Sequence, residues 1–124
     1  MIKDDFKEYL NSKGEPLYNY AIPDFKDIDF LINLTGDGMR EKYYSGDKIA
    51  IKVLDNVNEI IFGFDYCIWL NDSVETTLAR QILQGNCDET VLLHAYSPIR
   101  EDMIIAKSNI KYIGRIIGLI RTNL

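Results

Sequence analysis

Short stretches of alternating hydrophobic and polar residues run along most of the chain after its first 26 positions. In residues 48–54, Ile49, Ile51 and Val53 alternate with lysines and an alanine, the period of two expected for a strand with one buried face. Similar stretches, rich in apolar and β-branched residues, predict strands at residues 30–34, 66–70, 75–83, 90–94 and 112–121. Because no helix between them is long enough for a crossover to a parallel strand, the sequence predicts a mostly β fold of antiparallel, coiled sheets with one or two short helical turns.

The first 26 residues have a mixed pattern. Residues 5–10 could form one or two helical turns, and the breaker and turn residues at 11–16 end any such helix. The aromatic and apolar residues at 18–23 predict an extended, partly buried arm. We therefore expect residues 1–26 to be an N-terminal arm or linker and residues 27–124 to form the domain.

Composition narrows the class of protein. With 124 residues, of which 47% are hydrophobic and 27% charged, the chain has the length for one folded domain. Its net charge of -5 lacks the positive field that neutralises phosphates, so direct DNA binding is not expected. There is no signal peptide and no apolar run of about 20 residues, which predicts a cytoplasmic protein. Cys67 and Cys87 lack metal-site spacing and are expected to be reduced, packed cysteines.

Residues 36–47 are the most distinctive segment. They predict a turn with two glycines, one helical turn around residues 39–43, and a second turn leading into the strand at residue 48. The glycine spacing fits neither a P-loop nor a dinucleotide-binding motif, so turn formation explains these residues better than phosphate binding.

This segment resembles the Gly-Asp-Ser-Met-x-Pro-x-Tyr-x-x-Gly-Asp signature of the self-cleaving domains of the LexA and lambda repressor type, which are related to UmuD and signal peptidases. The matching residues are Gly36, Asp37, Met39, Tyr43, Gly46 and Asp47. Other segments of that family are resembled, in the same order along the chain, by residues 22–23 and 29–30, 78–80 and 113–120. The resemblance covers roughly residues 20–121 and implies coiled antiparallel sheets of the LexA and signal-peptidase type.

The chain departs from the family at the Ser-Lys dyad. Gly38 occupies the position of the nucleophilic Ser, and Ala79 occupies that of the Lys that takes its proton. Arg80 follows directly, but a guanidinium stays protonated and cannot serve as the base. The arm has one glycine, Gly14, whose neighbours do not resemble the family's cleavage site, and Glu41 replaces the signature proline. We therefore expect no peptidase activity.

No other residues form a convincing active site. Ser45 lies beside a glycine in a turn, Cys67 reads as a strand core residue, and His94 ends an apolar strand with no Ser or Cys placed near it by sequence. Several aspartates lie in turns and at strand starts, without the compact spacing of a metal-binding loop. We expect no metal and no cofactor. These turn carboxylates are Asp24, Asp27, Asp29, Asp37 and Asp47.

The end of the chain suggests self-association. From residue 112 to residue 120 it is nearly all apolar, with Arg115 as the one charge. Such a strand at a sheet edge would pair with a second copy, whereas a strand at the centre of the sheet would be buried in its own domain, and both readings stay open. In LexA-like repressors the similar region helps to form a two-fold dimer. The candidate interface residues are Ile116, Ile117, Gly118, Leu119 and Ile120.

The resemblance therefore implies a non-catalytic dimerisation and regulatory domain of a prokaryotic or phage transcriptional regulator of the repressor type. Its partner would be a second copy of itself, and DNA would be bound through an N-terminal helix-turn-helix domain, for which residues 1–26 are too short. Two alternatives remain: a module that binds an extended peptide in the former substrate groove near Gly38 and Ala79, and a peptidase with unrecognised catalytic residues.

Overall fold

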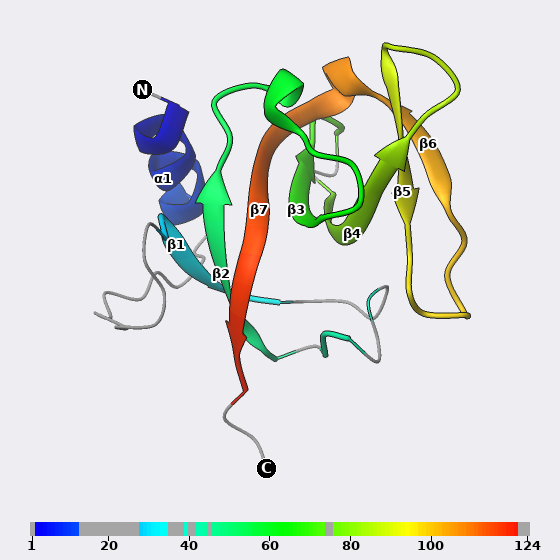
Figure 1. Ribbon diagram of the computed structural model, residues 1–124. Coiled ribbons are helices and arrows are strands. Elements are labelled where there is room, and N and C mark those ends of the chain that lie inside the picture. The colour runs from blue at the N-terminus through cyan, green and yellow to red at the C-terminus, as the bar shows by residue number, and fades with distance from the viewer. Residues whose placement is uncertain are drawn as a thin grey trace.

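The structure is a computed structural model that describes residues 2–12, 28–34, 39, 42–44, 46–73 and 76–121. Within this part of the chain a long sheet is accompanied by one α-helix and two short 3-10 turns (Figure 1). In chain order the elements are α1 (Ile2–Ser12), β1 (Phe30–Asn33), β2 (Lys48–Val53), η1 (Val57–Glu59), β3 (Asp65–Leu70), β4 (Thr77–Gln84), β5 (Thr90–His94), β6 (Met103–Ala106), η2 (Lys107–Asn109) and β7 (Ile110–Ile120).

All described strands belong to one seven-stranded sheet in the order β1-β2-β7-β3-β4-β5-β6, and every neighbouring pair is antiparallel. The mostly β, antiparallel fold expected from the sequence is therefore confirmed. The predicted strands correspond to β1, β2, β3, β4, β5 and β7, with ends that differ by at most two residues. Strand β6, a four-residue strand that pairs with β5, is not among the predicted strands.

The last strand, β7, lies at the centre of the sheet between β2 and β3. Of the two placements left open by the sequence, the central one is observed. Gly114 lets β7 approach β2 closely, because a Cβ at this position would lie 2.9 Å from Cδ1 of Ile51. The register of β2 and β7 shifts between Ala50 and Ile51, so that β7 has one residue more than β2 at this point, Ile117.

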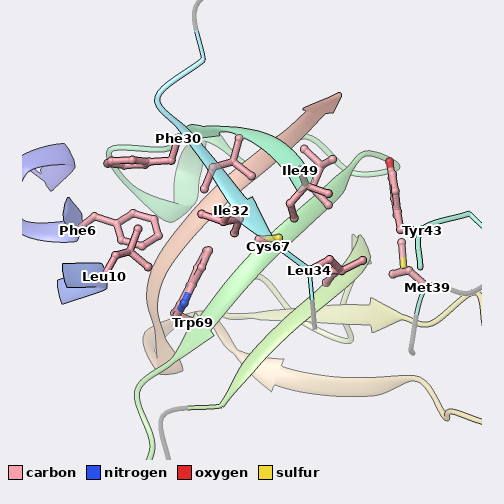
Figure 2. Close-up of a cluster of buried hydrophobic side chains, with 13 residues drawn as sticks. Phe6, Leu10, Phe30, Ile32, Leu34, Met39, Tyr43, Ile49, Cys67 and Trp69 are labelled. Carbon is pink, nitrogen blue, oxygen red and sulfur yellow. The ribbon is translucent and has the colours of Figure 1, made fainter. Parts of the chain in front are cut away.

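The two faces of the sheet carry separate hydrophobic clusters. The first cluster lies between α1, β1 and β2 on one side and β3 and β4 on the other (Figure 2). The second cluster lies on the opposite face, among β3, β4, β5 and β7. Its buried members are Tyr66, Ile68, Leu70, Ile82, Val91, Leu93 and Ile113. Neighbouring residues of β3 alternate between the two clusters, as the pleat of a strand requires.

Helix α1 is longer than the one or two turns expected, and it packs on the first cluster. Phe6 and Leu10, one helical turn apart, are both buried. The ring of Phe6 meets Trp69 edge-on at a centroid distance of 4.6 Å and stacks on Tyr112 at 4.7 Å. Residues 2–12 are therefore part of the domain core, which corrects their expected place in an arm. The remainder of that arm, residues 13–26, lies outside the described residues.

The two cysteines have different environments. Cys67 is buried in β3, as expected, whereas Cys87 is exposed in the turn between β4 and β5, so its expected packing role is wrong. Neither forms a disulfide. The part of the chain that the structure describes contains no helix with the length and apolar character needed to cross a membrane.

The packing of α1 predicts that Phe6→Ala lowers the free energy of unfolding by about 3–5 kcal/mol, the usual cost of removing a buried aromatic ring. Urea denaturation followed by tryptophan fluorescence measures this change, because Trp69 contacts the Phe6 ring. Lys7→Ala on the exposed side of the same helix is the matched control and should change stability by less than about 0.5 kcal/mol. Equal effects of the two substitutions would contradict a core role for α1.

Candidate functional site

The signature segment begins, in its described part, with a turn around Met39. The backbone amides of Lys42 and Tyr43 both donate to the Met39 carbonyl oxygen, at 2.9 and 2.8 Å. This is the helical turn predicted for residues 39–43. The Met39 and Tyr43 side chains are buried in the first cluster and anchor the turn to the core. Gly36, Asp37 and Gly38, as well as Ser45, lie outside the described residues.

Asp47 at the end of the segment connects it to the C-terminal end of β7. Its carboxylate, with 4% of the side chain exposed, accepts two hydrogen bonds from Arg121, from Nε at 2.9 Å and from a terminal nitrogen at 2.7 Å. It also accepts the backbone amide of Tyr44 at 2.9 Å, closing the turn. Gly46 has a φ of +94°, which favours glycine. The hydrogen bonds from Arg121 lower the pKa of Asp47 below its usual range.

Ala79 lies on β4 directly opposite Cys67 of β3. Its methyl group is buried and lines a pocket of about 40 Å³ between the end of β1 and the beginning of β4. This volume accommodates a few waters or a small apolar side chain. The lining residues are mainly apolar: Ile32, Asn33, Leu34, Ile49, Cys67, Trp69, Thr77, Leu78 and Ala79. The position that aligns with the family's lysine therefore opens onto a small apolar pocket that contains no amine among its lining residues.

Cys67 is the one thiol that lines this pocket. Burial raises its pKa far above that of a free thiol, and the negative charge of Asp65 raises it further. The thiolate is the form of cysteine that attacks carbonyl carbons, and it is strongly disfavoured here. The expectation that Cys67 is a strand core residue is confirmed.

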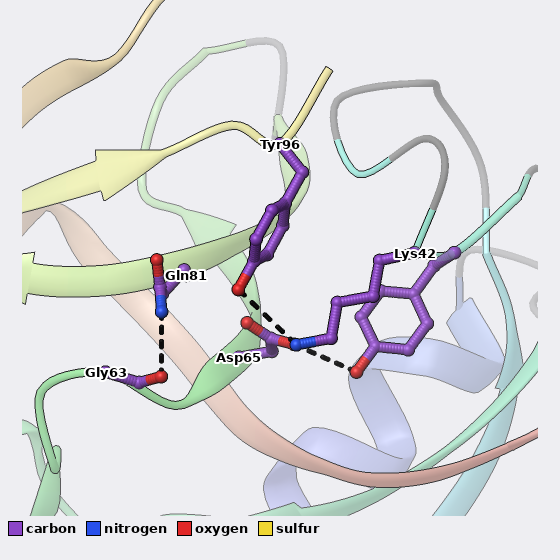
Figure 3. Close-up of polar contacts among 6 residues, drawn as sticks. Lys42, Gly63, Asp65, Gln81 and Tyr96 are labelled. Carbon is purple, nitrogen blue, oxygen red and sulfur yellow. Dashed lines mark hydrogen bonds and ion pairs between the residues drawn. The ribbon is translucent and has the colours of Figure 1, made fainter.

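A polar cluster that the sequence did not predict lies beside the signature turn (Figure 3). Asp65 at the start of β3 is buried, and its Oδ2 is 2.8 Å from Lys42 Nζ and accepts the Tyr43 hydroxyl at 2.9 Å. Lys42 also donates to the Tyr96 hydroxyl at 3.4 Å. The hydrogen bond to Asp65 raises the pKa of Lys42, and burial raises that of Tyr43. Lys42 therefore remains protonated and cannot take a proton as the family's neutral lysine does.

The sequence offered a weak indication of this cluster. Lys42 lies within the recognised segment, and Asp65 is a carboxylate at the start of a strand, but 23 positions separate them and no spacing rule pairs them. One oxygen of Asp65, Oδ1, is buried without a hydrogen-bond partner among the described residues. The geometry explains the cluster as a structural tie between the signature turn, β3 and the loop after β5.

The remaining candidates have structural contacts. His94 Nδ1 lies 2.9 Å from Oδ1 of Asp102, which also accepts the Ala95 amide. The imidazole packs edge-on against Tyr96. The Asp29 carboxylate forms an ion pair with Lys3. It also accepts a hydrogen bond from the backbone amide of Val53, the last residue of β2. Among the described residues, no group of three or more His, Cys, Asp and Glu side chains is placed to hold a metal ion.

The five interface candidates occupy the C-terminal half of β7 and differ in exposure. Ile116 is buried in the first cluster, Ile117 has 37% of its side chain exposed, and the other three are half-buried. All but Ile117 face a β2 residue in the strand register. Sequence reasoning missed Arg121, which follows them directly and holds this end of β7 to Asp47.

Comparisons with known proteins give no further assignment. No model of a known protein family matches the chain, and no curated protein matches it. The likeness to LexA-type domains therefore rests on the residues of the chain itself.

The Asp47–Arg121 pair predicts a pH-dependent contribution to stability. Because the folded-state pKa of Asp47 is below its unfolded value of about 3.9, the contribution is complete above about pH 5 and is lost as the pH falls through the folded-state pKa. We expect Asp47→Asn to cost about 2 kcal/mol at pH 7, the value typical of hydrogen bonds to a charged group.

Chemical denaturation at pH 7 and at pH 3 checks this prediction. The difference between wild type and Asp47→Asn should shrink at the lower pH. Asp88→Asn, in the exposed turn after β4, is the matched control and should have little effect at either pH. A stability difference for Asp47→Asn that does not change with pH would refute the assignment.

Proposed function

We propose that the chain is the non-catalytic dimerisation and regulatory domain of a LexA-like transcriptional regulator of the repressor type, acting in the cytoplasm. The proposal rests on the matching signature residues and on the replacement of both dyad groups by Gly38 and Ala79. Lys42, the nearest lysine of the signature segment, is paired with Asp65 and is not a substitute base. DNA would be bound by a helix-turn-helix domain of the same regulator, because the net charge of -5 of this chain disfavours contact with phosphates.

The observation that carries the dimer proposal is the length of β7 relative to β3. The register of β3 with β7 begins at the pair Tyr66–Arg115, whereas β2 pairs with β7 as far as Ile120. Residues 116–120 therefore have a strand partner on one edge within the described part of the chain. A second copy related by a two-fold axis would supply the other, and Ile117 would contribute apolar contact area.

This proposal predicts that Ile117→Asp weakens association through residues 116–120 at least tenfold, because it introduces a charge into that contact. Sedimentation velocity from 1 to 100 µM measures the weight-average mass, and far-UV circular dichroism verifies that the variant is folded. Ile61→Asp, another exposed isoleucine in the loop before β3, is the matched control and should associate like the wild type. A wild-type chain that is monomeric at 100 µM would rule the dimer out.

A second candidate function, capture of an extended peptide without cleavage, is favoured by the pocket between β1 and β4. Strand β1 pairs with β2 and is the first strand in the sheet order, so its other edge is available to an added strand in the described part of the chain. An extended peptide there could place a small apolar side chain beside Ala79.

For this candidate, we expect saturable binding of a fluorescent nine-residue peptide with a central valine, measured by fluorescence anisotropy. Thr77→Arg at the pocket should weaken binding at least tenfold, while Gln84→Arg at the exposed far end of β4 should not. Mass spectrometry after incubation at pH 10 should recover both peptide and protein intact. Cleavage would instead favour the peptidase alternative, and no binding at millimolar peptide would exclude capture.

A further inference from the structure

Strand β6 ends the sheet on the side opposite to β1. It pairs with β5, and within the described part of the chain no other strand lies on its outer edge. Its sequence is Met-Ile-Ile-Ala, with 41% of Met103 and 48% of Ile104 exposed. An apolar edge strand of this kind is a template for pairing with another strand, and no proline, lysine or bulge protects its four residues.

The hydrogen-bond pattern of β5 and β6 determines which backbone groups face outward. The Lys107 amide donates to the Glu89 carbonyl, at the position next to the registered pair Thr90–Ala106. In an antiparallel ladder, residues that exchange hydrogen bonds alternate with residues that do not. Met103 and Ile105 thus point their amides and carbonyls toward β5, and Ile104 and Ala106 point theirs away from it. The Lys107 amide also points toward β5, whereas the Lys107 carbonyl accepts the Ile110 amide in η2.

A second copy can pair with these outward groups in an antiparallel, two-fold arrangement. Outward-facing residues must lie opposite one another, which allows a register centred on Ile104. In that register Ile104 of one copy lies opposite Ile104 of the other, and Met103 lies opposite Ile105. Each pair brings apolar side chains together, the Ile104 pair on one face of the joined sheet and the Met103–Ile105 pairs on the other.

Charge distinguishes this register from its neighbours. Centred on Ile104, it places Glu101 of each copy opposite Lys107 of the other, and the two-fold axis repeats the pair. The next registers in which outward-facing residues lie opposite one another are centred on Met103 or Ile105. Neither of these registers places oppositely charged residues opposite each other. Asp102 fixes the beginning of the strand through His94 and the Ala95 amide, so Glu101 leads directly into the paired segment.

We propose that β6 is a self-pairing edge, through which two copies of this chain join their sheets into one continuous antiparallel sheet. The partner is a second copy, because the edge is apolar at its centre and carries a negative residue at one end and a positive residue at the other, which is self-complementary under two-fold symmetry. This edge is separate from residues 116–120, which lie on the central strand. The inference does not depend on the proposed regulatory function.

A charge-swap experiment tests this edge apart from the other surface. All proteins are full-length chains that carry Ile117→Asp, so that association through residues 116–120 is suppressed. Sedimentation velocity then compares this parent with Glu101→Lys, Lys107→Glu and the double variant. Each single change sets like charges opposite one another twice and should weaken dimerisation at least tenfold, whereas the double variant should return to within about threefold of the parent.

Hydrogen exchange provides a second readout that a general loss of stability would not reproduce. The outward amides of Ile104 and Ala106 should become protected as the parent concentration rises from 1 to 100 µM. The inward amide of Ile105 should be protected at both concentrations. A monomeric parent at 100 µM, single variants that associate like the parent, or a double variant as weak as the singles would each overturn the proposal.

Discussion

The antiparallel pairing of β7 with both β2 and β3 is the constraint on which the rest of the structure depends. Through β2 and β1 this strand supports the cluster covered by α1, and through β3 it supports the cluster on the opposite face. Ile116 belongs to the first cluster and Ile113 to the second, so one strand contributes to both cores. Gly114 favours this pairing, because a Cβ at that position would lie 2.9 Å from Cδ1 and 3.1 Å from Cβ of Ile51, and the Ile51 side chain would have to shift.

Two groups in or near the pocket region, the Cys67 thiol and the Lys42 amine, are held in their protonated forms. Cys67 and Ala79 line the pocket, and burial favours the protonated form of the Cys67 thiol. The nearest lysine of the signature segment, Lys42, is held protonated by Asp65. Nucleophilic catalysis requires a deprotonated nucleophile and a group able to accept a proton, and neither Cys67 nor Lys42 is in that form. The described part of the pocket offers a small apolar volume beside the end of β1.

The sequence was informative wherever one local pattern decides the structure. The alternation in β2, the turn around Met39 and the apolar run of β7 were each predictable from neighbouring residues. The length of helix α1 was underestimated because its two buried apolar residues, Phe6 and Leu10, make only a weak periodic pattern. Tertiary contacts of Phe6 with aromatic rings such as Trp69 stabilise the helix beyond what that pattern indicates. Strand β6 is too short to have a readable period. The pairing of Lys42 with Asp65 depends on how distant strands meet, which no local pattern contains.

The order of synthesis gives the position of β7 a further meaning. Every strand that β7 joins is earlier in the chain, and Arg121 reaches back across 74 positions to Asp47. Before β7 has left the ribosome, no strand joins the β1–β2 pair to the sheet of β3 to β6. Both hydrophobic clusters then lack the residues that β7 contributes. Cotranslational folding can therefore build hairpins early but completes both hydrophobic clusters only after β7 is available.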